Sequence, residues 1–142
     1  MAIRRFEDIQ AWQEARKLVK MIYLLTDEGK FAKDFGLRDQ IHRASVSIIA
    51  NIAEGFDCDS QVEFARFLGI ARHSAVEVQS LLYTALDVEY ITKEDFKTYY
   101  AQTDKAKALT GLLGTRYFER RYQSHKLRGT WYLKHGTYTL LL

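Results

Sequence analysis

The sequence contains no proline and only one cysteine among its 142 residues. Proline breaks helix interiors, so its absence leaves each helical segment free to run without interruption. The single Cys58 excludes an internal disulfide framework and a cysteine-based metal cluster. No apolar run reaches the length of a membrane span, and the first residues do not form a basic leader followed by an apolar stretch. We therefore expect a soluble, cytoplasmic protein that does not contact a membrane.

Acidic residues are scarce in the last part of the chain. Residues 116–142 contain six Lys or Arg and one acid, Glu119, which gives a charge of +5. The whole chain has 21 basic and 18 acidic residues, so the first 115 residues carry 15 and 17, a charge of −2. This asymmetry is typical of a protein that meets an anionic partner, most often nucleic acid, and also of a solubilising basic helix end.

Hydrophobic residues recur at helical spacing in four long segments. The pattern predicts helices over about residues 6–25 and 37–55, a third that begins after Ser60 and a fourth that begins after Thr92. Ser60 and Glu63 have the spacing of a capping box, and the segment after Thr92 repeats this signal more weakly. Short connections between such helices favour an all-α fold, an antiparallel up-down four-helix bundle.

We assign residues 1–128 to the bundle domain and residues 129–142 to a carboxyl-terminal tail. The tail is rich in aromatic and β-branched residues, which favours two strands that turn at His135 and Gly136. A two-stranded hairpin is barely stable alone, so such a tail would dock on the bundle or on a neighbouring subunit. A disordered tail is the alternative.

The second predicted helix is apolar on two sides. Its inward face carries Leu37, Ile41, Ala44, Ile48 and Ile52, and its opposite face carries Val46, Ala50 and Ala53. A helix of this kind needs two contact surfaces, so we expect it to pack in its own bundle and also against another chain or an extra element.

A polar stripe lies between these two apolar faces. It combines with charged residues of the third helix into a candidate site made of Arg43, Ser47, Asn51, Glu54, Arg72 and Glu77. We interpret it as a hydrogen-bonded structural seam between the second and third helices or between subunits, with a ligand site as the alternative. Within the seam, Asn51 and Glu54 are predicted to form a buried hydrogen-bonded pair.

The candidate nucleic-acid surface lies on the fourth helix, where basic and aromatic residues alternate. Its members are Arg116, Arg120, Arg121, Tyr122, Lys126 and Arg128. Lysine and arginine bind phosphates, and tyrosine stacks on exposed bases. The alternative places Tyr117 in the core and the arginines in solvent or in salt bridges between subunits. A second basic group on the first helix, which includes Arg16, Lys17 and Lys20, is diluted by nearby acids.

Signals for catalysis are weak. The four histidines, at positions 42, 73, 125 and 135, have no partner at a metal-binding spacing. The glycines at 111 and 114 lie within a helical pattern and lack the lysine of a phosphate-binding loop, and Ser47 and Ser74 have no base nearby in sequence. We therefore predict no catalytic residue, no metal and no cofactor, and a protein that is not an enzyme.

Five blocks occur in an order that resembles a known family. They lie at residues 5–13, 35–44, 47–55, 63–68 and 71–77, and the most recognisable is Ala50-Asn51-Ile52-Ala53-Glu54-Gly55. Over about residues 3–120 the chain is similar to the four-helix-bundle proteins encoded within intervening sequences of bacterial 23S rRNA. It departs from them at Ile49, where proline is usual, and at His73, where glycine is usual.

The resemblance implies a homo-oligomeric bundle, a pentamer, without enzymatic activity. It also implies kinship with the accessory variability determinant proteins of diversity-generating retroelements, which assist a reverse transcriptase. Our leading hypothesis is a non-enzymatic oligomer that binds structured RNA or a ribonucleoprotein. The alternative is a protein-interaction scaffold or an accessory subunit for a reverse transcriptase.

Overall fold

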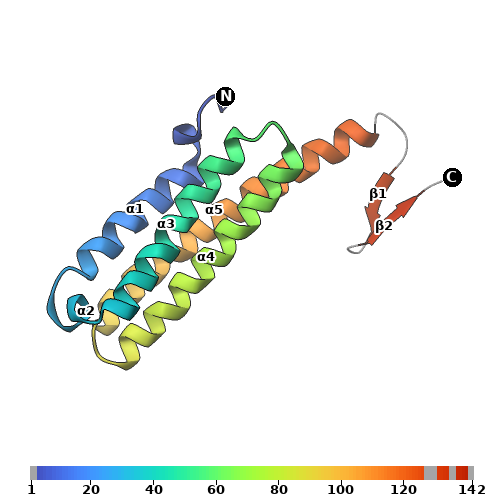
Figure 1. Cartoon of the computed structure of the whole chain (residues 1–142). Coiled ribbons are helices and arrows are strands. Elements are labelled where there is room, and N and C mark those ends of the chain that lie inside the picture. Colours follow the sequence, from blue (N-terminus) through green and yellow to red (C-terminus); the bar gives the residue numbers. More distant parts are fainter. Residues whose placement is uncertain (1–2, 127–130, 135–136, 141–142) are drawn as a thin grey trace.

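Four long helices form an antiparallel bundle in the computed structural model (Figure 1). The structure describes the backbone of residues 3–126, 131–134 and 137–140, and the side chains of residues 3–117. The long helices are α1 (Gln10–Leu25), α3 (Phe35–Asp57), α4 (Gln61–Asp87) and α5 (Lys93–Lys126). Helix α1 packs against α3 and α5, and α4 packs against the same two helices, so the four enclose one core. The predicted all-α bundle is confirmed. No helix among the described residues is long and apolar enough to cross a membrane.

Two short helices were not expected from the periodicity. The predicted first helix is divided into a 3-10 turn, η1 (Phe6–Asp8), and α1, because Ile9 between them adopts an extended conformation. The connection between the first two predicted helices contains a further short helix, α2 (Gly29–Lys33). Gly29 begins that turn with a φ of 65°, a value that glycine adopts readily, and Phe31 anchors it in the core.

Both predicted helix caps are present. The cap at Thr92, which had the weaker sequence signal, has both hydrogen bonds of a capping box, whereas the cap at Ser60 has one. At the start of α5, the Asp95 N–H donates to Thr92 Oγ1 at 3.1 Å and the Thr92 N–H donates to Asp95 Oδ2 at 3.3 Å. At the start of α4, Ser60 Oγ accepts from the Glu63 N–H at 3.4 Å. The Glu63 carboxylate does not return this bond, because it pairs with Arg66 at 2.9 Å.

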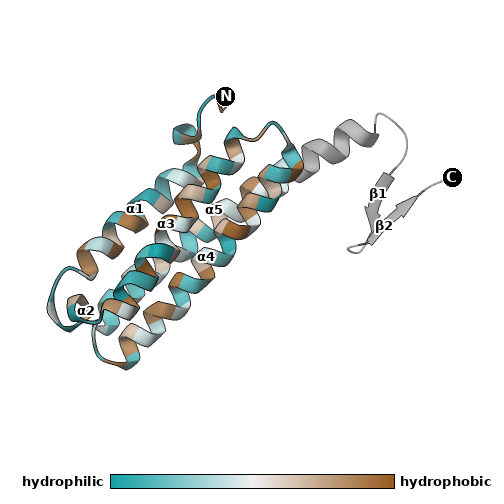
Figure 2. Cartoon of the chain, in the orientation of Figure 1, coloured by the Kyte–Doolittle hydropathy of each residue, from teal (hydrophilic) through white to brown (hydrophobic). Residues whose placement is uncertain are grey.

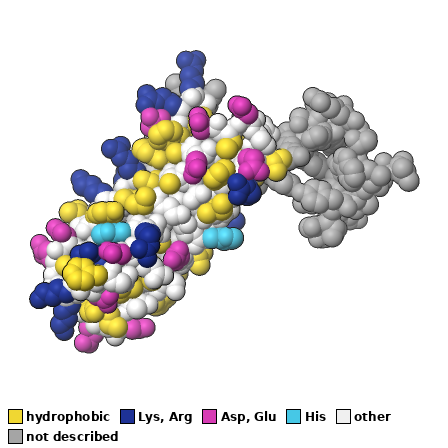
Figure 3. Space-filling view, viewed as in Figure 1, with side chains coloured by type: hydrophobic (Ala, Val, Ile, Leu, Met, Phe, Trp, Pro, Cys, Tyr) yellow, Lys and Arg dark blue, Asp and Glu magenta, His cyan; other side chains and the backbone are white. Residues whose placement is uncertain are grey.

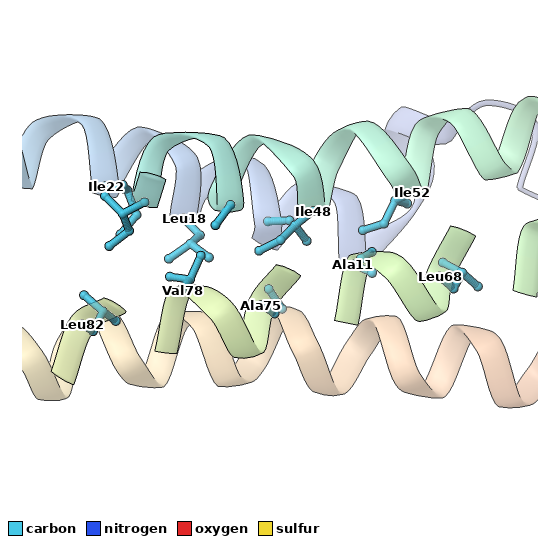
Figure 4. Close-up of a cluster of buried hydrophobic side chains, with 14 of the residues drawn as sticks. Ala11, Leu18, Ile22, Ile48, Ile52, Leu68, Ala75, Val78 and Leu82 are labelled. Atoms are coloured by element: carbon cyan, nitrogen blue, oxygen red, sulfur yellow. The ribbon is translucent and has the colours of Figure 1, made fainter. Parts of the chain in front are cut away.

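The core follows the predicted inward faces. Hydrophobic and hydrophilic residues alternate along each bundle helix with the helical repeat (Figure 2). Figure 4 shows the buried side chains that meet between the helices, among them Ala11, Leu18, Ile22, Ile48, Ile52, Leu68, Ala75, Val78 and Leu82. Ala71, Ala75 and Ala85 on α4 are fully buried, which lets the neighbouring helices approach closely.

The tail contains the two predicted strands. Strand β1 (Trp131–Lys134) pairs antiparallel with β2 (Thr137–Leu140), so that Trp131 lies opposite Leu140 and Lys134 opposite Thr137. The predicted turn at His135 and Gly136 lies outside the described residues.

Candidate functional site: polar seam and basic surface

A chain of hydrogen bonds connects α3 to α4. Asn51 Nδ2 donates to the Ser47 carbonyl at 2.7 Å and to Ser47 Oγ at 3.0 Å. The Oγ atoms of Ser47 and Ser74 lie 2.8 Å apart, and Ser74 Oγ donates to the Ile70 carbonyl at 3.1 Å. Because the Ser74 proton is directed to that carbonyl, the Ser47 hydroxyl donates to Ser74. The hydrogen bonds therefore run in one direction along the chain, from Asn51 to Ser47 on α3, across to Ser74 on α4, and then to the Ile70 carbonyl.

A second contact extends this seam toward the start of α3. Gln40 Nε2 donates to Glu77 Oε1 on α4 at 3.3 Å, at an exposed position. Ser47, Asn51 and Glu77 thus lie where a structural seam between the two helices requires them. Nothing in this geometry requires a ligand, since each donor already has an acceptor in the protein.

Three of the predicted seam residues lie elsewhere. Arg43 and Glu54 are exposed, and within residues 3–117 neither side chain forms a hydrogen bond or ion pair across the seam. The predicted buried pair of Asn51 and Glu54 is therefore wrong, because Asn51 bonds to Ser47 instead. The Arg72 guanidinium lies near Gly111 of α5 and not at the contact of α3 with α4. Helical spacing places residues on a face but does not fix where a long side chain ends.

The periodicity did not assign Ser74 to the seam. Ser74 is buried among the inward residues of α4, between Ala71 and Val78. A buried hydroxyl needs a hydrogen-bond partner, and a serine in the middle of an apolar stripe is the signal that could have identified it.

Replacing Asn51 with alanine is expected to lower stability by about 1 kcal/mol, because the side chain's bonds to Ser47 are lost. For a chain of this size this corresponds to a fall in melting temperature of about 3–5 °C. Thermal unfolding followed by circular dichroism, with the mass measured by light scattering, checks both the fold and the assembly. Ser80→Ala, at an exposed position on α4, is the control. An unchanged melting temperature and mass for the Asn51 variant would argue against the seam.

A second polar cluster joins α1 to α5 and was not predicted. The Glu14 side chain is only 8% exposed and accepts from Lys17 Nζ at 2.8 Å. From α5, Gln102 Nε2 donates to Glu14 Oε2 at 3.0 Å and to the Glu14 carbonyl at 2.9 Å. Lys105 Nζ, also on α5, lies 3.2 Å from Glu14 Oε2. The bond from Lys17, with those from Gln102 and Lys105, lowers the pKa of Glu14 to about 2 against the opposing effect of burial.

A similar arrangement joins α4 to α5. Lys107 Nζ donates to Gln79 Oε1 at 2.8 Å and pairs with Asp104 at 2.9 Å. Gln79 Nε2 donates to the same Asp104 carboxylate at 3.3 Å. Helix α5 is therefore fixed by polar contacts on both of its sides.

The described histidines have different surroundings. The ring of His42 stacks on Tyr23 at 3.9 Å between centroids, and its Nε2 lies 2.5 Å from Thr26 Oγ1. Burial, with the nearby Arg38 charge, lowers the pKa of His42, which favours the neutral imidazole. His73 is exposed on α4. Among the described residues, no three His, Cys, Asp or Glu side chains gather as a metal site would require.

Five of the predicted nucleic-acid residues lie between Arg116 and Lys126 at the end of α5. Arg116 is exposed. The Tyr117 ring packs edge-on against Phe64 with centroids 4.6 Å apart, so Tyr117 belongs to the core, as the alternative interpretation held. The structure describes only the backbone of α5 at Arg120, Arg121, Tyr122 and Lys126, and not their side chains. Arg128 lies outside the described residues.

A family model identifies the group of proteins to which this sequence is related. The model of the 23S rRNA-intervening sequence protein matches residues 7–111. The chain belongs to this family. The matched span runs from within η1 through α1, α2, α3 and α4 to the first half of α5. It includes the polar seam and the Glu14 cluster of this 23S rRNA-intervening sequence protein.

The fold of this family member is similar to that of a solved structure. A protein of unknown function from the S23 ribosomal protein family of Bacteroides thetaiotaomicron shares 25% sequence identity with it, at a TM-score of 0.68. The match covers 74% of this chain and 95% of the other. No curated protein matches the sequence.

Proposed function

We propose that this family member is a non-enzymatic, oligomeric helical bundle that acts in the cytoplasm and binds structured RNA or a ribonucleoprotein. The observation that carries the proposal is the charge of +5 over residues 116–142, against −2 over the rest of the chain. Nucleic-acid affinity is dominated by cations that neutralise phosphates, and a concentrated basic region supplies them. The family description, which refers to intervening sequences of 23S rRNA, supports an RNA context.

The exposed face of α3 supports assembly. Val46 is 37% exposed, Ala50 is exposed and Ala53 is half-buried, so the second apolar face of this helix lies outside the bundle. Figure 3 shows hydrophobic side chains exposed on the face of the molecule that α1, α3 and α4 form. A second copy of the chain would cover such a surface, which supports the proposed homo-oligomer. The pentameric state is what the family resemblance implies.

A second candidate function also rests on the exposed apolar face of α3. A protein-interaction scaffold, or an accessory subunit for a reverse transcriptase, would bind its partner through the exposed apolar face of α3. Binding by an apolar surface is insensitive to salt, whereas binding to phosphates weakens steeply as salt rises. Salt therefore distinguishes the two functions.

The proposed function is tested by replacing three arginines of α5 together, in the variant Arg116→Ala, Arg120→Ala and Arg121→Ala. Fluorescence anisotropy with a labelled RNA hairpin at one fixed salt concentration is expected to show affinity reduced about tenfold or more, because up to three phosphate contacts are lost. The matched control replaces Lys30, Lys33 and Lys97, which are exposed and lie away from this stretch. Equal affinity for the wild type, the variant and the control would contradict a nucleic-acid role for this helix.

A further inference from the structure

The Glu14 cluster holds two cations from different helices at one place on the surface. Lys17 of α1 and Lys105 of α5 each place an ammonium group on a different oxygen of the Glu14 carboxylate, at 2.8 and 3.2 Å. Gln102 fixes the same carboxylate from α5. The buried acid thus holds the two ammonium groups, one from α1 and one from α5, on the two oxygens of one carboxylate. We call Lys17, Glu14 and Lys105 the lysine clip.

The lysine clip has a net positive charge and N–H donors that Glu14 does not accept. Two ammonium groups surround one carboxylate, so the local charge is +1. Each ammonium carries three N–H donors, of which Glu14 accepts one. The Lys17 and Lys105 side chains are 63% and 54% exposed, whereas Glu14 is 8% exposed. The cations therefore face solvent and the acid does not, which is the arrangement that an incoming anion requires.

Further basic residues lie near the lysine clip on both α1 and α5. Lys20 is exposed one turn after Lys17 on α1, and Lys and Arg side chains stand along the α1 edge of the molecule (Figure 3). On α5, Arg116 follows Lys105 by eleven residues, or three turns, so the two share a face. The exposed positions between them on that face are Ala108 and Leu112, neither of which is acidic. The basic positions extend over about 16 Å of the helix.

We propose that the lysine clip binds the phosphates of structured RNA, and that the RNA backbone lies along the α1–α5 face from the clip toward Arg116. This inference rests on the proposed RNA binding and names its second contact region, within the part of the chain matched by the family model. Ammonium groups read phosphate positions and carry no base code, so recognition here is by RNA shape. Glu14 is a positioning residue, because it holds the two cations and does not itself contact the RNA.

The test compares salt dependence of binding in two charge-matched variants of the full chain. Lys17→Gln with Lys105→Gln removes the cations of the clip, and Lys30→Gln with Lys33→Gln removes two exposed lysines of α2. Anisotropy with a labelled RNA hairpin is expected to give a salt slope shallower by about 2 in the clip variant, one unit for each lost contact. The α2 variant is expected to keep the wild-type slope.

Two further variants separate binding from folding. Adding Glu14→Gln to the clip variant removes the unpaired buried acid, and this triple variant is expected to show the same shallower slope. Lys17→Arg with Lys105→Arg keeps both charges and is expected to restore the wild-type slope. A wild-type salt slope in the triple variant would overturn the proposed role of the lysine clip. The same result follows if the α2 variant shows a slope as shallow as that of the clip variant. Neither result contradicts RNA binding by the protein itself. Wild-type protein that binds no RNA overturns both this inference and the proposed function.

Discussion

Replacing Gly55 with alanine is expected to destabilise the bundle by about 2–4 kcal/mol, because it overpacks the core. Gly55 is buried near the end of α3, where α4 passes close by. A Cβ at this position would lie 2.6 Å from Phe67 Cβ and 2.9 Å from Phe64 Cδ2. Since the Phe67 Cβ is attached directly to the backbone of α4, it cannot rotate away. The helices would have to separate, and the aromatic contacts of Phe64 would be strained.

Urea unfolding followed by circular dichroism measures this effect. The matched control is Gly69→Ala on α4, since the added Cβ would meet no described atom of another element within 4 Å. Alanine favours a helix interior by about 0.5–1 kcal/mol over glycine, so the control is expected to be stabilised. Wild-type stability in the Gly55 variant would show that α3 and α4 do not approach as closely as described.

The second large effect concerns Glu14 and acid. In the folded protein its pKa is about 2, against 4.5 in the unfolded chain, so the folded state binds fewer protons at this site. The stabilisation is therefore fully present above about pH 4.5 and is lost as the pH falls toward 2. The shift corresponds to at most about 3 kcal/mol between these limits. At pH 7 we expect Glu14→Gln to cost about 2 kcal/mol, because charged hydrogen bonds become neutral ones.

The measurement is the free energy of unfolding of the wild type and of Glu14→Gln between pH 7 and pH 3. Their difference should shrink as the pH falls, because protonation of Glu14 makes the wild type resemble the variant. Glu54→Gln removes an exposed acid from α3 and serves as the control, with little change expected. A difference that stays constant with pH would mean that the two lysines do not hold Glu14 in its ionised form.

Much of the fold could be predicted because it depends on local signals. The inward stripe of α3 and the caps at Ser60 and Thr92 follow from spacing that a single helix carries in its own sequence. The division between η1 and α1, and the short α2, could not be predicted. Both depend on tertiary contacts, such as the burial of Ile9 and Phe31, that override the local pattern.

The candidate sites were harder to predict than the fold. Helical spacing located Ser47 and Asn51 on the side of α3 that meets α4. It misplaced Arg72, whose long side chain reaches Gly111, a residue 39 positions away in the sequence. Glu14 was overlooked because its partners Gln102 and Lys105 lie on α5, with Gln102 88 positions away in the sequence. A lone carboxylate beside Ala11 and Ala15 on the inward edge of α1 was the available signal.

The most direct test of the proposed RNA binding is the affinity of the wild-type protein for a structured RNA, measured by anisotropy over a series of salt concentrations. If the basic residues of α5 and the lysine clip neutralise phosphates, the logarithm of the binding constant should fall linearly with the logarithm of salt. The expected slope is about −3 or steeper. Affinity that does not change with salt, or no binding near physiological salt, would contradict RNA binding and favour the protein-interaction scaffold.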